Sequence, residues 1–209
     1  MDDAVVVALF RHGLTEENKR KAYIGWTDSP ICEDVGEVLS RQSFQSSPYE
    51  RIVTSDLKRC LQTAHILFPD QNVGVMREFR EMNFGRWEGK TYTELAGDPY
   101  YEEWIHHHFT SEPPEGESYP VFADRVEKGW QVVCAHMLEE RFKSLAIVTH
   151  GGVMRYLLSK LVPEKRDFWE WKVPHGQGFE FVWSSNEAFR RGDRCNLLRV
   201  VPLTENPAG

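Results

Sequence analysis

Two short segments of the sequence place a histidine directly after an apolar run. Arg11-His12-Gly13 follows the run from Val5 to Phe10, and His150-Gly151-Gly152 follows Leu145 to Thr149. A neutral imidazole can attack phosphorus without a separate base, an arginine fork can hold phosphoryl oxygens, and glycines let helix N–H groups approach an anion. Either histidine alone would more often be structural. Their parallel placement favours a phosphate site with a histidine nucleophile.

Two further charged residues fit such a site. Arg59 is expected in the first turn of a helix, where a cation is unfavourable unless a bound anion compensates it. The plainer interpretation is a solvated surface arginine. Glu81 lies in an irregular segment, residues 77–89, whose carboxylates could simply be solvated. Beside a bound phosphate, the like charge would favour the protonated carboxyl, which could then give its proton to a leaving alkoxide.

Composition narrows the classes of protein. The 209 residues carry a net charge of −7, which disfavours nucleic acid as a partner, and no stretch approaches the roughly 20 apolar residues of a membrane span. Met1-Asp2-Asp3 does not begin a signal peptide, so we expect a cytoplasmic protein with reduced thiols. The four cysteines form no CxxC pair, and the consecutive residues of His106-His107-His108 cannot share one helix face, so we expect no metal and no cofactor.

The elements that must position these residues alternate between strand and helix. Strands are expected at 5–10, 51–54, 73–76, 145–149, 180–183 and 196–201. Helices are expected from a Ser55 cap to Phe68, from Ser118 to Arg141 and from Val153 to about Leu161. This order predicts a three-layer α/β/α sandwich around a mostly parallel sheet, whose ligands gather at the carboxyl ends of the strands. All three polar segments, at 11–13, 55–59 and 150–152, fall at such ends.

The chain is expected to form one domain, 1–209. No repeat or linker divides it, and its strongest loop signal is the Pro-rich and Glu-rich segment 110–117. A lid-like insertion is expected around 88–118. A homodimer through an exposed aromatic patch is compatible with the sequence, although no residue identifies such a patch.

Taken together, the motifs resemble the histidine phosphatase superfamily, the clan of cofactor-dependent phosphoglycerate mutases and many small phosphatases. The resemblance runs in order from about residue 5 to residue 160. The segments that carry it are Leu9-Phe10-Arg11-His12-Gly13, Asn18, Ser55-Asp56-Leu57-Lys58-Arg59, Gln62-Thr63-Ala64, Glu81 with Phe84-Gly85-Arg86-Trp87-Glu88-Gly89, and Thr149-His150-Gly151-Gly152.

The resemblance implies a role for each matched residue. His12 would be the nucleophile that forms a phosphohistidine, and Arg11, Arg59 and His150 would complete the catalytic phosphate pocket. Glu81 would donate a proton to the leaving group and then activate water. Asn18, Gly25 and Gly151 would contribute to phosphate and substrate binding. The implied enzyme is a metal-independent phosphoric monoester hydrolase of the histidine acid phosphatase type, acting on a small phosphorylated substrate.

The branch of the family is less well defined by the residues. Phe84-Gly85-Arg86-Trp87-Glu88-Gly89-Lys90 stands where the mutases carry a different segment, which favours the phosphatase branch. Four segments faintly resemble α-ribazole-5′-phosphate phosphatases: Tyr101-Glu102-Glu103-Trp104, Pro114-Glu115-Gly116-Glu117-Ser118, Arg125-Val126 and Phe168-Trp169. A cofactor-dependent phosphoglycerate mutase is the alternative, and a non-catalytic phospho-ligand binder is a third hypothesis.

Overall fold

The sheet that positions the site has six strands. The computed structural model describes residues 3–44, 46–175 and 177–202. The strands stand in the order β3-β2-β4-β1-β5-β6. Their bounds are Val5–Arg11 (β1), Arg51–Thr54 (β2), Val73–Val75 (β3), Ser144–Thr149 (β4), Gln177–Trp183 (β5) and Leu197–Pro202 (β6). The neighbours β3, β2, β4 and β1 pair in parallel, whereas β5 is antiparallel to β1 and to β6.

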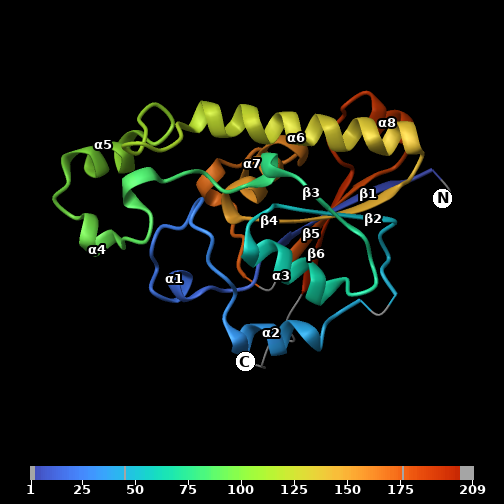
Figure 1. The fold of residues 1–209 in the computed structure, drawn as a ribbon. Helices are drawn as coiled ribbons and strands as arrows, with labels where there is room; N and C mark the ends of the chain where they lie inside the picture. Colours follow the sequence, from blue (N-terminus) through green and yellow to red (C-terminus); the bar gives the residue numbers. More distant parts are fainter. Residues whose placement is uncertain (1–2, 45, 176, 203–209) are drawn as a thin grey trace, which may run out of the picture.

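Helices cover both faces of this sheet (Figure 1). They are Glu16–Lys19 (α1), Glu33–Ser40 (α2), Lys58–Leu67 (α3), Tyr92–Leu95 (α4), Pro99–His107 (α5), Tyr119–Glu140 (α6), Gly151–Leu161 (α7) and Asn186–Arg190 (α8). Three short 3-10 turns stand at Arg77–Phe79 (η1), Gly85–Trp87 (η2) and Phe168–Glu170 (η3).

Strand β1 joins two hydrophobic cores because its side chains alternate between the faces of the sheet. Ala8 and Phe10 pack in the core under α2 and α3, and Val7 and Leu9 pack in the core under α6 and α7. All four side chains are fully buried, which explains the continuous apolar run in the sequence. The predicted three-layer sandwich with a mostly parallel sheet is confirmed.

The register of three adjacent strands brings their polar ends together. In the parallel pairs, Arg11 lies opposite Thr149, and Thr54 lies opposite Val148. The first residue after each strand continues the pairing, since the N–H of His12 donates to Thr149 O (3.0 Å) and that of Ser55 to Val148 O (3.1 Å). The carboxyl ends of β2, β4 and β1 therefore meet at one edge of the sheet.

One local prediction was wrong. Helix α3 begins at Lys58 with Leu57 as its N-cap, so Ser55 does not cap it. Ser55 is fully buried, and its Oγ lies 3.0 Å from Nε2 of His150. Ser55 therefore contacts a histidine of the site, although its place in the sequence is typical of a helix N-cap.

Residues 88–118 leave the sheet and carry α4 and α5 to one end of the molecule (Figure 1). Leu95, Tyr101 and Trp104 anchor this segment in the core on the α6 side. The predicted loop at 110–117 contains no helix or strand. The single-domain and lid interpretations of the sequence stay predictions. None of the described helices has the length and apolar character needed to cross a membrane.

Gly129 lets α6 approach η1, the turn that precedes Glu81. A Cβ at Gly129 would stand 2.7 Å from Glu78 Cβ and 3.2 Å from the Phe79 ring. We expect Gly129→Ala to lower the free energy of unfolding by about 1–3 kcal/mol despite the better helix propensity of alanine. The matched control is Gly36→Ala in α2, where the nearest atoms lie at 3.8 Å and a gain of up to about 1 kcal/mol is expected. Urea unfolding of both variants measures the two changes in the free energy of unfolding. Equal changes in Gly129→Ala and Gly36→Ala would contradict the prediction.

Candidate active site

His12 stands at the end of β1 with a single nitrogen free for chemistry. Its Nδ1 lies 2.7 Å from Gly13 O, and a carbonyl oxygen can only accept, so Nδ1 carries the proton. Burial, then the positive charge of Arg59, holds the pKa of His12 well below its usual value. The ring is therefore neutral, and its Nε2 lone pair is unprotonated. This is the state that a nitrogen nucleophile needs.

His150 stands at the end of β4 beside His12. The ring centroids are 5.1 Å apart, and the two rings meet edge to face. Nε2 of His150 contacts Ser55 Oγ at 3.0 Å and Cys60 Sγ at 3.3 Å. Burial, followed by the charge of Arg59, places the pKa of His150 well below its usual value. Two neutral imidazoles thus lie side by side at the edge of the sheet.

A third histidine lies against the first. His175 precedes β5, and its ring centroid is 5.3 Å from that of His12. Its Nδ1 donates to His12 O at 3.0 Å, and burial lowers its pKa to about 4. No motif in the sequence marks His175 as a site residue. Its contact with His12 depends on the antiparallel pairing of β5 with β1.

Arg11 and Arg59 bring two positive charges to the same place, one partly and one fully buried. Arg59 is 0% exposed, and it donates to Gly25 O (2.6 Å) and Thr27 O (2.8 Å). Arg11 donates to Val173 O at 2.5 Å. The Nε atom of each has no hydrogen-bond partner, and within the described ranges neither guanidinium forms an ion pair with a carboxylate. Burial lowers both pKa values, that of Arg11 to about 10, so both remain cations.

Asn18 and Gly25 line the approach to these groups. Thr15 N–H donates to Asn18 Oδ1 at 3.2 Å, which orients the amide and leaves its Nδ2 available as a donor. Asn18 borders the main cavity. Gly25 admits no side chain, because a Cβ would lie 2.0 Å from Met82 O. The structure thus brings Asn18 to the cavity and uses the carbonyl of Gly25 to hold Arg59.

Glu81 reaches the N-terminus of α7 from the other side. Its Oε2 accepts from Gly152 N–H at 2.8 Å, and its Oε1 accepts from Met82 N–H at 2.9 Å. A Cβ at Gly152 would stand 2.1 Å from Oε1. The anion site that the sequence predicted at this helix start is occupied here by a carboxylate. Gly151 lies beside Arg11, because its Cβ position is 3.3 Å from the guanidinium carbon.

A cavity of about 490 Å³ opens between Glu81, Arg11 and the segment 88–118. Its walls include seven aromatic side chains: Tyr23, Phe84, Trp104, Tyr119, Phe122, Phe168 and Trp169. His108 also borders it, where Trp169 Nε1 donates to His108 Nε2. In the sequence, His108 stands out only as part of a histidine triplet. Among the described residues no group of three or more His, Cys, Asp or Glu could hold a metal ion.

Two further arginines belong to the site: Arg155 carried no signal in the sequence, and Arg125 was marked there only as part of a faint family similarity. Arg155 borders the cavity from α7, donates to Trp171 O at 3.2 Å and stands 5.6 Å from the Trp169 ring centroid. Arg125 holds the segment around Glu81 from α6. Each lies within a helix, where an arginine usually faces solvent. Only the tertiary structure shows that these two arginines lie on the packed face of their helices. Such residues are found only from the tertiary arrangement.

Comparison with known proteins matches residues 7–189 to the histidine phosphatase superfamily (branch 1), and the chain belongs to this superfamily. An adenosylcobalamin/alpha-ribazole phosphatase of Salmonella typhimurium is 28% identical over 175 residues, which span 80% of this chain and 85% of that protein. A broad-specificity phosphatase of Saccharomyces cerevisiae is 30% identical over 174 residues, 77% of this chain and 72% of its own. The crystal structure of the alpha-ribazole phosphatase from Shigella flexneri has the same fold, with a TM-score of 0.77 over 98% of both chains at 23% identity.

The three neutral histidines make stability depend on pH. Below the ordinary value of 6.5 the unfolded chain binds protons that the folded chain excludes, so the free energy of unfolding falls as pH falls. Each buried histidine contributes up to about 1.4 kcal/mol per pH unit. For His175 this window runs from 6.5 down to about 4. We expect His175→Gln to flatten the slope between pH 6.5 and 5, as measured by urea unfolding.

The matched control for this experiment is His136→Gln, at an exposed position on α6. It should leave the slope of the parent protein unchanged. If His175→Gln and His136→Gln show the same slope, His175 does not exclude a proton on folding.

Proposed function

We propose that the protein is a metal-independent phosphomonoesterase that works through a covalent phosphohistidine on His12. The observation that carries this proposal is a pair of arginines beside a neutral histidine, Arg59 fully buried and Arg11 partly buried, neither of which forms an ion pair with a carboxylate among the described residues. A buried charge without a counterion is costly, and a phosphate dianion would supply the missing negative charge to both guanidiniums. A cytoplasmic location and a homodimer stay predictions of the sequence.

The first step transfers the phosphoryl group to the enzyme. His12 Nε2 attacks phosphorus, the P–O bond to the leaving group breaks, and the Glu81 carboxyl gives its proton to the departing oxygen. Arg11 and Arg59 hold the phosphoryl oxygens as charge develops on them, with His150 and the Asn18 amide as further contacts. Glu81 suits this task because its carboxyl lies at the border between the arginines and the cavity.

The second step releases inorganic phosphate. A water molecule takes the place of the leaving group, the Glu81 carboxylate accepts its proton, and the hydroxide oxygen attacks phosphorus as the P–N bond breaks. His12 Nε2 regains its lone pair, and Glu81 is protonated again for the next cycle. Atoms and charge balance without any group beyond the ester and water.

The cavity favours a phosphate ester with a flat apolar leaving group. Aromatic walls bind such a group by stacking and by exclusion of water, and the Arg155 guanidinium adds a donor for an oxygen or ring nitrogen on it. The benzimidazole riboside of α-ribazole-5′-phosphate meets this description, and the Salmonella typhimurium relative is named for that substrate class. We propose α-ribazole-5′-phosphate as the preferred ester.

The phosphoglycerate mutase alternative shares the same pocket and differs in its product. A mutase would return the phosphoryl group to a second hydroxyl, so 3-phosphoglycerate with a bisphosphoglycerate primer would give 2-phosphoglycerate. The proposed phosphatase gives inorganic phosphate. The aromatic side chains of the cavity suit a ring-bearing leaving group better than a short carboxylate, which favours the phosphatase.

Removal of the proposed nucleophile tests the reaction type. With EDTA present, the parent protein should release phosphate from p-nitrophenyl phosphate, and His12→Ala should lower the rate at least about 10³-fold, since covalent catalysis is lost. His65→Ala, at an exposed histidine on α3, is the matched control and should keep the parent rate. A colorimetric phosphate assay gives both values. Parent-like turnover by His12→Ala would refute the assignment.

Truncation of the cavity wall tests the substrate class. Trp169→Ala should raise KM for α-ribazole-5′-phosphate about 5- to 30-fold, because a stacking surface worth about 1–2 kcal/mol is lost. For glycerol phosphate, which has no ring to stack, KM should change less than about 2-fold. Tyr100→Ala, at an exposed aromatic residue of α5 that does not border the cavity, is the control. An equal change of KM for both esters would rule out an aromatic subsite.

A further inference from the structure

The segment that bears Glu81 has little backbone support of its own. Residues 80–84 lie between η1 and η2 and belong to no helix or strand. A strand or helix would pair the carbonyls of such a segment, and an unpaired buried carbonyl is costly. The position of the Glu81 carboxyl therefore depends on what binds these carbonyls.

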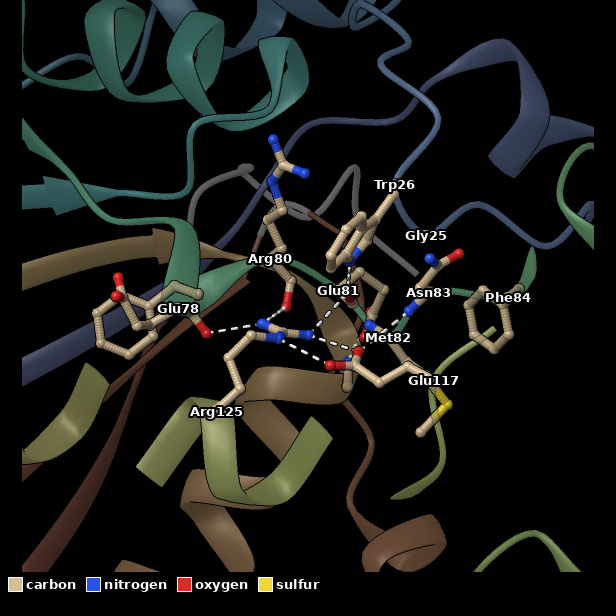
Figure 2. Close-up of polar contacts among 12 residues, drawn as sticks. Gly25, Trp26, Glu78, Arg80, Glu81, Met82, Asn83, Phe84, Glu117 and Arg125 are labelled. Atoms are coloured by element: carbon tan, nitrogen blue, oxygen red, sulfur yellow. Dashed lines mark hydrogen bonds and ion pairs between the residues drawn. The ribbon is translucent and has the colours of Figure 1, made fainter. Parts of the chain in front are cut away.

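One guanidinium binds two of these carbonyls and a third from η1 (Figure 2). Arg125 Nη1 donates to Glu78 O at 2.8 Å and to Arg80 O at 3.0 Å, and Nη2 donates to Glu81 O at 3.2 Å. A lysine could not reproduce this pattern, because a single ammonium nitrogen cannot spread its donors over a planar fork.

A buried carboxylate fixes the guanidinium in turn. Arg125 Nε donates to Glu117 Oε1 at 2.9 Å, and Nη2 donates to Oε2 at 2.7 Å. With these two bonds all five N–H groups of Arg125 have acceptors. Glu117 also accepts from Asn83 N–H at 3.2 Å, so the pair holds the segment on both sides of Glu81. Glu117 is 8% exposed, which keeps water from replacing these bonds.

A tryptophan completes the support. Trp26 Nε1 donates to Glu81 O at 3.0 Å, the same oxygen that Arg125 binds, and the Trp26 ring centroid lies 4.9 Å from the Arg80 guanidinium carbon. Figure 2 shows Trp26 and Arg125 converging on the backbone of Glu81. The carboxyl of Glu81 extends the other way, to the N–H of Gly152.

We propose that the Arg125–Glu117 pair is a positioning device for the proton donor of the reaction and thereby sets which leaving groups the enzyme accepts. Arg125 acts through the backbone of Glu81, whereas Arg11 and Arg59 act on the phosphoryl group. The proposal rests on the proposed function, in which Glu81 protonates the leaving oxygen. Loss of the Arg125–Glu117 pair should slow departure of the alcohol more than it weakens binding of the phosphoryl group.

Leaving groups that differ in their need for a proton test this proposal. An alkoxide needs a proton to depart, whereas 2,4-dinitrophenolate departs without one. We expect Arg125→Lys to lower kcat/KM for glycerol phosphate at least about 30-fold, because a misplaced general acid loses part of the roughly 10²- to 10⁴-fold rate gain that proton transfer provides. For 2,4-dinitrophenyl phosphate, kcat/KM should fall less than about 3-fold, because its leaving group needs no proton. The value of kcat/KM reports the steps up to phosphoryl transfer, so slow hydrolysis of the phosphoenzyme does not hide the effect.

Two further variants separate positioning from folding. Glu117→Gln keeps the shape of the side chain that binds Arg125 and one of its two acceptor oxygens. It should lower kcat/KM for glycerol phosphate more than for 2,4-dinitrophenyl phosphate, as Arg125→Lys does, but by a smaller factor. If Arg125→Lys fails to fold, Glu117→Gln provides the test. Adding Arg125→Lys to Glu81→Gln should cause no further loss for glycerol phosphate, since the donor is already absent. Arg86→Ala, which breaks the exposed pair with Glu115, is the matched control and should leave both esters unaffected.

Two outcomes would overturn the proposal. Equal losses for both esters in Arg125→Lys and Glu117→Gln would show that the pair supports the fold alone, and parent-like values for both esters would show that it does not position Glu81. An inactive parent protein would refute the proposed function itself and this inference with it. The parent assay therefore distinguishes the two failures.

Discussion

The structure depends on one constraint: two arginines, Arg59 fully buried and Arg11 partly buried, stand at one edge of the sheet without an ion pair to any described carboxylate. Arg59 is fully buried in the first turn of α3, where the helix dipole also opposes a cation. The fold offsets part of this cost with the carbonyls of Gly25 and Thr27. A carboxylate would offset more, but it would also compete with a phosphate. Burial, and then the charge of these arginines, holds the pKa of His12 well below its usual value and keeps the ring neutral.

The site has two halves with different kinds of support. The phosphate half stands at the ends of β1, β2 and β4, where ladder hydrogen bonds and two hydrophobic cores fix the backbone. The half that faces the leaving group is made of loops and of side chains from α5, α6 and α7, and Arg125 holds the backbone of the loop that bears Glu81. This division suits a reaction in which the phosphoryl group is constant and the alcohol differs among substrates.

The same division explains what could be predicted from the sequence. Strand ends have a local signature, a buried apolar run followed by Arg-His or His-Gly-Gly, so the amino-acid pattern alone was enough to place Arg11, His12 and His150. Arg125 and His175 have no such signature. Arg125 lies within a regular helical pattern, and His175 reaches His12 only through the antiparallel pairing of β5. Ser55 was misassigned because a cap and a buried partner of histidine use the same residue type.

Gly25 joins the two halves at a single point. Its carbonyl accepts from Arg59 at 2.6 Å, and its Cα packs so closely on Met82 O that no Cβ fits between them. Thus Arg59 and the segment that carries Glu81 contact the same peptide. The bond between phosphorus and the ester oxygen has one length in every phosphomonoester. In the proposed reaction, this shared peptide would keep the distance between the phosphate group and the proton donor constant, while the cavity wall beyond it could change with the alcohol.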